Sequence, residues 1–405
     1  MVGDDRALID PSVTESAAMD AAELPDPVLD APNPGPPASR WKFLPHFDVG
    51  IRWDDNIFIQ PNNEIEDLIF TFSPGLAIGY LDEESRLTRF LDREERASRI
   101  NRFEGNFLLL DYTPSFIVFA DHDSENSFDQ EARFEARWQL RKLSIAAQAR
   151  YISEQEANVE LNSRLRHTGV GGGVSANYQI SERTSVEVGG YVQHDKYENA
   201  SGNTEYRAET FLGYEVSPVL KFGLGAAFGY VEVENAQNQT FERILARGSY
   251  EITAKVEATV QAGVEFRQSD GGGNDRTNPI FELDLTYLPA EATRVGLNVY
   301  RRVLSSISEP AEYVTSTGAG LKFSRMLRDG LRFTAEGGYR SSEYSDSAIG
   351  PARSDDYFYG SAALLYSFAH WGSVELSYEY RKNDSSRATS DFTNNQVALA
   401  LSLTF

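Results

Sequence analysis

Long stretches of this sequence alternate between apolar and polar residues at every second position, and this pattern limits the fold more than any other feature. In the last ten residues, the apolar side chains on one side are Val397, Leu399, Leu401, Leu403 and Phe405. A period of two residues is typical of a β-strand with two unlike faces. The stretches run for about 12–18 residues, whereas strands of soluble sheets have about 5–6 and a strand that crosses a bilayer needs about 9–11. The pattern therefore predicts transmembrane strands.

Eighteen such stretches follow one another from residue 43 to the C-terminus. In hydrocarbon, every backbone N–H and C=O group needs a partner, so a spanning sheet must close on itself. We therefore predict an all-β fold, a transmembrane antiparallel up-and-down β-barrel of about eighteen strands, with sixteen as the alternative count. An even number returns the chain to the side on which it began. The predicted strands are 43–54, 66–80, 103–120, 127–140, 143–155, 165–179, 184–198, 203–216, 219–233, 239–251, 254–268, 276–288, 293–305, 312–325, 330–344, 354–368, 372–383 and 392–405.

The connections between the predicted strands alternate in length. After even-numbered strands they are mostly short, as at 141–142 and 181–182, and after odd-numbered strands they are longer and polar, as at 156–164 and 345–351. Short turns on one side and longer loops on the other are typical of the periplasmic and extracellular rims of a membrane barrel. The exception is 81–102, a long charged segment that follows an even-numbered strand. We interpret it as a periplasmic helix, as a segment folded into the barrel mouth, or as an extension of the two strands beside it.

An aromatic residue recurs near the end of each even-numbered strand from the fourth onward, at intervals of 36–43 residues by subtraction of the residue numbers. Aromatic rings prefer the headgroup level of a membrane, so we predict that these residues form a membrane girdle. A period near 37 could also indicate a β-propeller, but a blade needs four short strands and each period here holds two long ones. The predicted girdle residues are Trp138, Tyr178, Tyr214, Tyr250, Tyr287, Phe323, Tyr366 and Phe405.

The polar faces of the strands carry charges of both signs. Each such charge would cost about 2–4 kcal/mol on a lipid-facing surface near the midplane, so these side chains must face water or each other. They either form salt bridges within the lumen wall, worth roughly 0.2–1 kcal/mol each, or line a pore whose charged rings select solutes. The candidate pore-lining residues are Arg133, Arg137, Arg150, Arg207, Glu209, Arg243, Arg247, Glu257, Glu265, Arg267, Glu282, Asp284, Arg332, Glu336, Arg340, Glu375, Glu379 and Arg381.

Composition narrows the remaining classes. The net charge of −23 argues against a nucleic acid partner, because phosphate binding needs a basic face. Residues 1–40 are rich in proline and acidic residues and are expected to be a disordered periplasmic tether in front of a barrel domain 41–405. The first residues lack the basic and apolar regions of a signal peptide. If the protein reaches an outer membrane, we expect that its leader has been removed or is missing from this sequence.

Nothing in the sequence indicates an enzyme or a cofactor. The chain has no cysteine, which excludes thiolate catalysis and cysteine-based metal sites. None of the five histidines lies two or four residues from another, so no histidine metal pair is visible. A catalytic triad can be assembled from distant strands, and spacing alone does not detect one. We expect no catalytic residues, no metal site and no cofactor.

Two segments near the start carry a family resemblance. Phe47–Gln60 reads FDVGIRWDDNIFIQ and Glu66–Tyr80 reads EDLIFTFSPGLAIGY. A Trp-Asp-Asp-Asn-Ile-Phe strand exit followed by Ser-Pro-Gly-Leu resembles the opening of the putative beta-barrel porin 2 family. That resemblance implies an outer-membrane barrel, and some barrels of this kind are similar to exopolysaccharide-export barrels. From the residues alone, Asp54, Asp55 and Asn56 favour a strand end and a turn, with a Ca²⁺ site as the alternative.

These observations lead to a ranked set of functions. The first is an outer-membrane channel of a Gram-negative-type bacterium that passively exports an extracellular polysaccharide, with outer-membrane lipid around it and a periplasmic polysaccharide-export protein as partner. The second is a general diffusion porin. The third is a structural or adhesive barrel plugged by 81–102 or 1–40. The C-terminal aromatic Phe405 resembles the signal that the barrel-insertion machinery reads, so we expect that machinery as a further partner.

Overall fold

The computed structural model describes residues 41–81, 106–234, 237–270, 275–307, 313–344 and 353–405. The predictions for the tether 1–40 and for the charged segment 82–102 lie outside these residues. Within the described part of the chain, no helix is both long and apolar enough to cross a membrane.

Eighteen β-strands make up nearly all of the described chain, as the alternation predicts. Their ends lie within four residues of the predicted ends. The largest difference at a strand start is at the third strand, which begins at Phe107 instead of residue 103. The strands are β1 (Trp41–Asp54), β2 (Asp67–Leu81), β3 (Phe107–Phe119), β4 (Ser127–Gln139), β5 (Leu143–Asn158), β6 (Ser163–Gln179), β7 (Thr184–Tyr197), β8 (Asn203–Ser217), β9 (Leu220–Val233), β10 (Gln239–Thr253), β11 (Val256–Ser269), β12 (Arg276–Ala290), β13 (Thr293–Ser305), β14 (Tyr313–Arg328), β15 (Leu331–Tyr344), β16 (Ser354–Ala369), β17 (Gly372–Ser385) and β18 (Phe392–Thr404).

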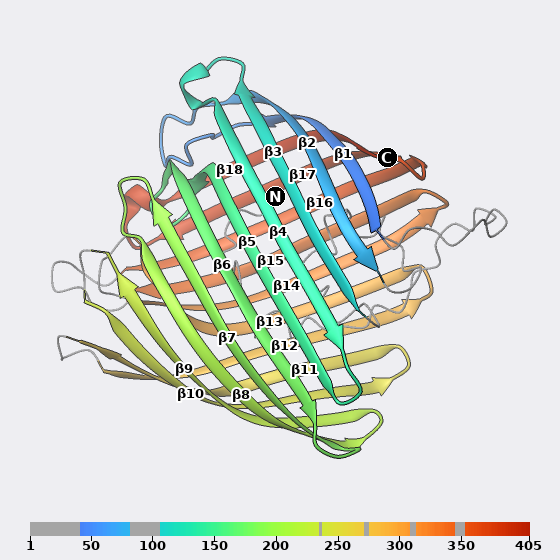
Figure 1. Ribbon diagram of the computed structural model, residues 1–405. Helices are drawn as coiled ribbons and strands as arrows, with labels where there is room; N and C mark the ends of the chain where they lie inside the picture. The colour runs from blue at the N-terminus through green and yellow to red at the C-terminus, as the bar shows by residue number, and fades with distance from the viewer. Residues whose placement is uncertain (1–40, 82–105, 235–236, 271–274, 308–312, 345–352) are drawn as a thin grey trace.

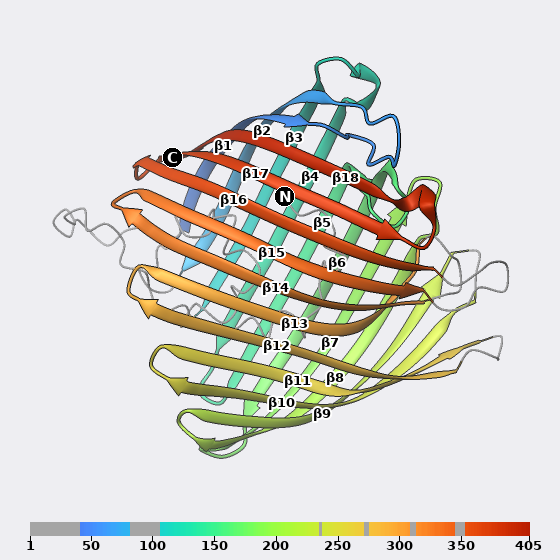
Figure 2. The same cartoon turned by 180° about the vertical axis from the view of Figure 1, so that it is seen from behind.

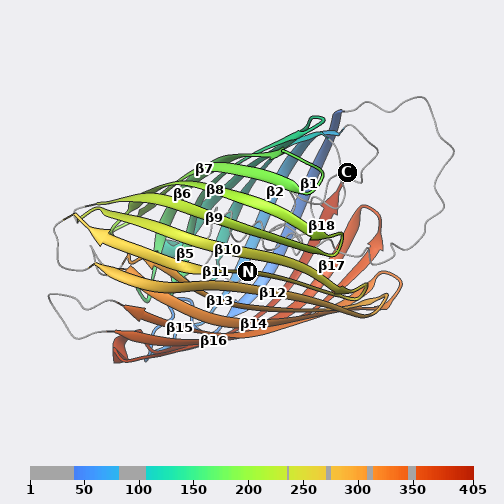
Figure 3. The same ribbon diagram turned by 90° about the horizontal axis from the view of Figure 1, so that it is seen from below.

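The sheet closes on itself. Each strand pairs antiparallel with the next one along the chain, and β1 also pairs with β18 from His46 opposite Thr404 to Asp54 opposite Gln396. The strands of the front wall cross those of the back wall at a steep angle (Figures 1 and 2), as expected when tilted strands form a closed barrel. Seen from below, the wall continues around the whole molecule (Figure 3). The predicted eighteen-stranded up-and-down barrel is confirmed.

The two rims of the barrel differ as predicted. At one rim the chain turns within two residues at 218–219, 254–255, 291–292, 329–330 and 370–371. In the turn 329–330, Gly330 has a φ of +73°, a left-handed conformation that glycine adopts without steric cost. The opposite rim carries longer connections, among them 55–66 and 120–126. We name these rims the turn side and the loop side.

The two faces of the wall have opposite chemistry. Large apolar side chains such as Phe72, Leu224 and Ile244 are exposed on the outer face, and charged side chains such as Glu265 and Arg267 are buried on the inner face. A soluble protein buries its apolar side chains and exposes its charges. The reverse arrangement fits a wall with lipid outside and a polar lumen inside.

Candidate functional site

All the charged residues proposed as pore-lining lie on the inner face of the wall. They occupy alternate positions of β4, β5, β8, β10, β11, β12, β15 and β17, and each is buried or half-buried. The residues between them along the strands point to the other face; for example, Arg243 is followed in sequence by Ile244, which is 64% exposed. The whole set therefore lies on the inner face of the barrel wall, and its role in lining a pore stays a prediction.

A buried charge cluster joins β10 and β11. Glu265 accepts hydrogen bonds from Arg243 Nε and Arg267 Nε, both at 2.8 Å, through its two carboxylate oxygens. Arg267 also donates from Nη1 to Gln239 Oε1 at 2.9 Å. Glu265 has no exposed surface and Arg267 has 2%. Because a buried charge is tolerated only when it is paired and hydrogen-bonded, this cluster belongs to the rigid wall.

A second ion pair joins β10 to β7, which is three strands away in the wall. Arg247 on β10 donates from Nη2 to Glu187 Oε2 on β7 at 2.5 Å. Its guanidinium lies 4.0 Å from the ring centre of Phe211 on β8. Gly223 on β9 leaves room for the arginine, since a Cβ there would lie 3.1 Å from Arg247 Cγ. A side-chain-free position on β9 therefore allows Arg247 to lie flat along the wall.

Aromatic rings cover inner-face glycines at several places. Phe241 lies where a Cβ of Gly229 would be, and Phe211 lies where a Cβ of Gly225 would be. The guanidinium carbons of Arg243 and Arg267 lie 4.5 and 5.0 Å from the centre of the Phe241 ring. Cation–π contacts of this kind hold a guanidinium in one orientation. The lumen surface at these sites consists of oriented arginines over aromatic rings.

Other candidates pair with residues that the sequence analysis did not single out. Glu131 on β4 accepts from Arg133 and, at 2.9 Å, from Arg150 on β5. On β17, Arg381 donates from Nη2 to Asn394 Oδ1 at 2.7 Å. Partners such as Glu131, Glu187 and Asn394 stand at inward positions of the same alternation, which is the signal that could have identified them.

The loop-side mouth holds a contact that the sequence does not reveal. Residues 159–162, the connection of β5 and β6, form what we name the mouth bridge. Glu160 Oε1 accepts hydrogen bonds from Ser306 Oγ at 2.6 Å and from the Ile307 N–H at 2.8 Å. The Glu160 carbonyl oxygen accepts one from Arg353 Nη1 at 2.8 Å. Ser306 follows β13 and Arg353 precedes β16, which lie about halfway around the strand order from β5 and β6.

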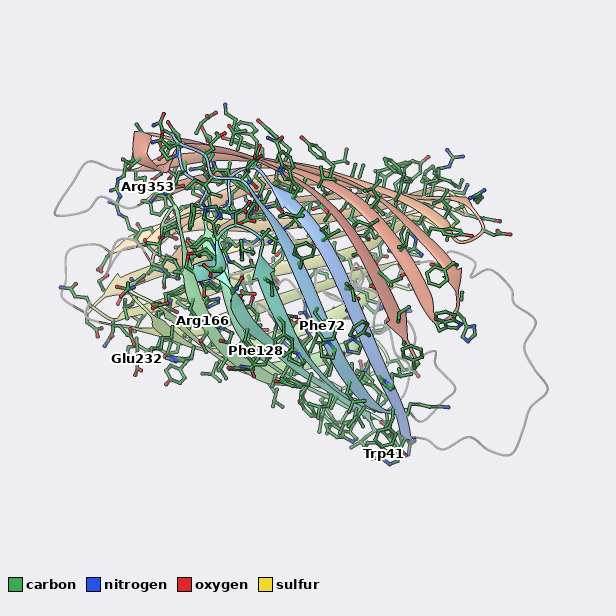
Figure 4. All side chains as sticks on the ribbon, turned by 90° about the horizontal axis from the view of Figure 1, so that it is seen from above. Trp41, Phe72, Phe128, Arg166, Glu232 and Arg353 are labelled. Carbon is green, nitrogen blue, oxygen red and sulfur yellow. The ribbon has the colours of Figure 1, made fainter. Side chains whose placement is uncertain are left out.

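Apolar contacts support the same bridge. Val159 packs with Ile59, Tyr357 and Phe392, which come from the connection 55–66, from β16 and from β18. On the other side of the bridge, Ile307 packs with Leu165 and Tyr197, and Leu161 lies against them. Arg353 and Arg166 are seen toward the same end of the barrel, with Trp41 at the far end (Figure 4). The loop-side mouth is therefore crossed by a contact with a polar centre and apolar flanks.

The outer face shows where the predicted girdle residues lie. Seven of the eight aromatics are among the exposed large apolar side chains, and Phe323 is half-buried beside Phe333. All eight lie near the turn side.

A second group of exposed aromatics lies toward the loop side and was missed, because its members do not recur at a regular interval. They include Phe128, Tyr206, Phe228, Tyr339, Phe358 and Tyr378.

The polar tips of the loop-side aromatics bond toward the loop rim. Tyr339 donates to Asp356 at 2.6 Å and Tyr378 donates to Asn395 at 2.8 Å. On β16, Phe358 and Tyr366 are eight residues apart, which is roughly 20 Å along the barrel axis at about 3.3 Å per residue and a tilt of about 40°. The apolar band of a membrane barrel is about 25 Å tall, and a girdle role for these two aromatic levels stays a prediction.

Solved structures with a similar fold include proteins of Pseudomonas aeruginosa. OccK11 (OpdR) aligns with 90% of this chain and 96% of its own, at 13% identity and a TM-score of 0.45. OpdL aligns with 90% and 99%, at 14% identity and 0.46. OpdQ aligns with 90% and 99%, at 10% identity and 0.47.

No curated protein matches the sequence. The model of the family described as Putative beta-barrel porin 2 matches residues 34–405. The match extends the resemblance noted at 47–80 over the whole barrel. With lipid-facing apolar side chains, a closed antiparallel wall and a polar interior, this chain is an outer-membrane β-barrel of the porin type and belongs to the Putative beta-barrel porin 2 family.

Proposed function

We propose that this barrel is the passive outer-membrane conduit through which an extracellular polysaccharide is exported. The observation that carries the proposal is the mouth bridge. A general diffusion pore must stay open to small solutes, whereas the loop-side mouth here is crossed by residues 159–162, which bond to the far wall through Glu160. A mouth that is bridged at rest suits a conduit that opens for one kind of cargo.

The inner wall supports this assignment. It presents hydroxyl, amide and paired charged groups, such as Ser361, Asn298 and Gln261, on the face that looks into the lumen. These groups can form short-lived hydrogen bonds with sugar hydroxyls, and each bond exchanges readily with water. Conduction requires such weak, multi-site contacts. The wall therefore supplies the surface that a moving polysaccharide needs.

The test compares a polymer with small sugars on the full-length protein. In planar bilayers, a soluble polysaccharide added on the turn side should enter the lumen and reduce the ion current. In vesicles carrying the same protein, monosaccharides should enter slowly. Fast monosaccharide uptake together with a current that the polymer leaves unchanged would contradict the export proposal.

A general diffusion porin is the second candidate, and the pairing of inner charges favours it. Glu265 pairs with both Arg243 and Arg267 within the wall, so these charged groups bind one another and are less available to select a solute. This function expects steady conductance and fast uptake of small sugars.

The partners follow from the position of the barrel. We propose that the C-terminal strand, which ends in the exposed Phe405, engages the barrel-insertion machinery. We also propose that a periplasmic polysaccharide-export protein docks at the turn side. A variant with Phe405→Ala should assemble more slowly into the outer membrane, and normal assembly would contradict the first of these proposals.

A further inference from the structure

The mouth bridge is carried by a long hairpin. β6 has 17 residues and β5 has 16, so both strands are at the long end of the range in this barrel. Their connection is only four residues, 159–162. The extra length lets the tip of the hairpin reach residues beside β13 and β16, which lie about halfway around the barrel.

The tip itself is pre-shaped. Asn158 Oδ1 accepts hydrogen bonds from the N–H groups of Glu160 at 3.0 Å and Leu161 at 3.1 Å. The Asn162 N–H donates to the Asn158 carbonyl at 2.8 Å, and Asn162 has a φ of +53°. Asparagine tolerates this left-handed conformation better than most residues. The turn is thus fixed within the hairpin, and it can move as a unit when its contacts with the far wall are released.

Glu160 concentrates the polar contacts of the tip. One of its carboxylate oxygens holds both Ser306 Oγ and the Ile307 N–H, and its backbone carbonyl holds Arg353. Glu160 is 4% exposed and Ser306 is 2% exposed. Arg353 is oriented in turn by Asp355, to which its Nε donates at 2.9 Å. Glu160 therefore binds prearranged donors of the far wall through both its side chain and its backbone carbonyl.

A further hydrogen bond and apolar contacts hold the tip. Asn162 Nδ2 donates to the Thr389 carbonyl at 2.7 Å. The remaining flanks are the small apolar groups around Val159 and Ile307. A hydrogen bond that exchanges with water has a modest net free energy, whereas an unpaired buried carboxylate is strongly unfavourable. The closed bridge is stable because its carboxylate is paired. It can open when water replaces the partners of Glu160 as the tip moves away from them.

We propose that residues 159–162 form a gate at the loop-side mouth, that Glu160 is the positioning residue that keeps it closed, and that its release sets the size of solute that passes. The proposal rests on the channel function proposed above. In the closed state Glu160 binds Ser306, Ile307 and Arg353. In the open state the hairpin tip leaves them and all of these groups bind water.

The first experiment measures the size limit. Glu160→Ala removes the acceptor, and in vesicles it should shift sugar uptake toward larger oligosaccharides and raise the single-channel conductance. Glu160→Gln keeps an acceptor oxygen, so its size limit should stay closer to that of the unaltered protein. Glu182→Ala is the matched control, because Glu182 is exposed in a turn on the opposite rim. An unchanged size limit in Glu160→Ala would overturn the gate.

The gate can be locked and released chemically in a single variant, because the chain has no cysteine of its own that would react. The double variant Glu160→Cys with Ser306→Cys places the only two thiols at the contact. A reducible bifunctional thiosulfonate reagent that joins them should lower the conductance, and a reducing agent should raise it again. If the conductance changes neither on cross-linking nor on reduction, the proposal is contradicted.

A second readout does not depend on conduction. Ile307 is 3% exposed in the closed contact, so a thiol placed by Ile307→Cys should react slowly with a polar thiol reagent. Adding Glu160→Ala should accelerate labelling by about tenfold or more, since hydrogen bonds to a charged group are lost. Equal labelling rates would refute the gate. Faster labelling in a barrel that never conducts would leave the gate standing and refute the channel function.

Discussion

Gln396 on the last strand donates a hydrogen bond from Nε2 to Asp54 Oδ2 on the first strand at 2.9 Å, across the seam that closes the barrel. Asn394 Nδ2 donates to the other oxygen of Asp54 at 2.5 Å. Beside it, Asp55 accepts from the N–H and from the side-chain amide of Asn395, both at 2.6 Å. The Trp-Asp-Asp-Asn segment is therefore a clasp between β1 and β18, and amide donors occupy the oxygens that suggested a Ca²⁺ site.

Removal of the clasp should destabilise the closed barrel. Asp54→Ala removes the carboxylate that accepts the shortest hydrogen bonds of Asn394 and Gln396 at this buried position, and a hydrogen bond to a charged group contributes about 1.5–3 kcal/mol. A folded barrel in detergent migrates faster on a gel when it is not boiled. We expect the Asp54→Ala variant to lose this fast migration at a lower temperature than the unaltered protein. A urea titration in the same detergent gives the change in the free energy of unfolding.

Asp123→Ala is the control for the clasp, because Asp123 is exposed in the connection between β3 and β4. If both variants melt at the same temperature as the unaltered protein, the clasp contributes nothing to closure.

The fold was predictable because the alternation of apolar and polar residues follows directly from the two surroundings of the wall, lipid outside and water inside. In β11, Val260 faces outward and Thr259 inward, and the same parity continues to Phe266 and Glu265. A slip of one residue would exchange the two faces, so the pattern determines the register as well as the strand. The third strand was set too early, at residue 103, because the charged segment before it merges with the strand pattern.

Side-chain contacts between strands that are not neighbours were not predictable in this way. Glu160 and Ser306 are 146 residues apart and meet only because the β5–β6 hairpin crosses the mouth. Arg247 finds Glu187 because a glycine on β9 leaves the path free. Neither relationship follows the two-residue period. The alternation placed Arg247 among the inward-facing candidates but identified neither Glu160 nor Glu187, and the closed barrel determines which side chains meet.

The assignment of the two faces can be tested with adjacent residues of one strand. Ser361 lies on the inner face between Glu336 and Glu379, and Ala362 lies on the outer face near the centre of β16. Ala362→Arg should impair insertion, because a lipid-facing arginine near the midplane costs about 2–4 kcal/mol. Ser361→Arg should insert normally, since two carboxylates flank the new charge. Yields of heat-modifiable barrel in the membrane fraction compare the two, and equal yields would refute the assignment.

Glycines on the two faces should respond differently to the same change. A Cβ at Gly229 would overlap the Phe241 ring, whereas a Cβ at Gly190 would meet nothing within 4 Å. Gly229→Ala should therefore destabilise the barrel by about 1–3 kcal/mol, the usual cost of overpacking. Gly190→Ala should change the free energy of unfolding by less than about 0.5 kcal/mol. Urea unfolding in detergent measures both changes. If Gly229→Ala leaves the free energy of unfolding unchanged, the Phe241 ring does not pack on the wall at Gly229.

The charge cluster of β10 and β11 makes the strongest prediction for the wall. Glu265→Ala leaves Arg243 and Arg267 without their shared carboxylate, and Arg267 is almost fully buried. Breaking a buried pair by removing one partner costs about 3–5 kcal/mol, so this variant should unfold at clearly lower urea concentration. The triple change Glu265→Ala, Arg243→Leu and Arg267→Leu removes the stranded charges and should recover much of the loss. If the triple variant is no more stable than Glu265→Ala alone, the penalty does not come from unpaired guanidinium groups, and the cluster is held by the cation–π contacts with Phe241 instead.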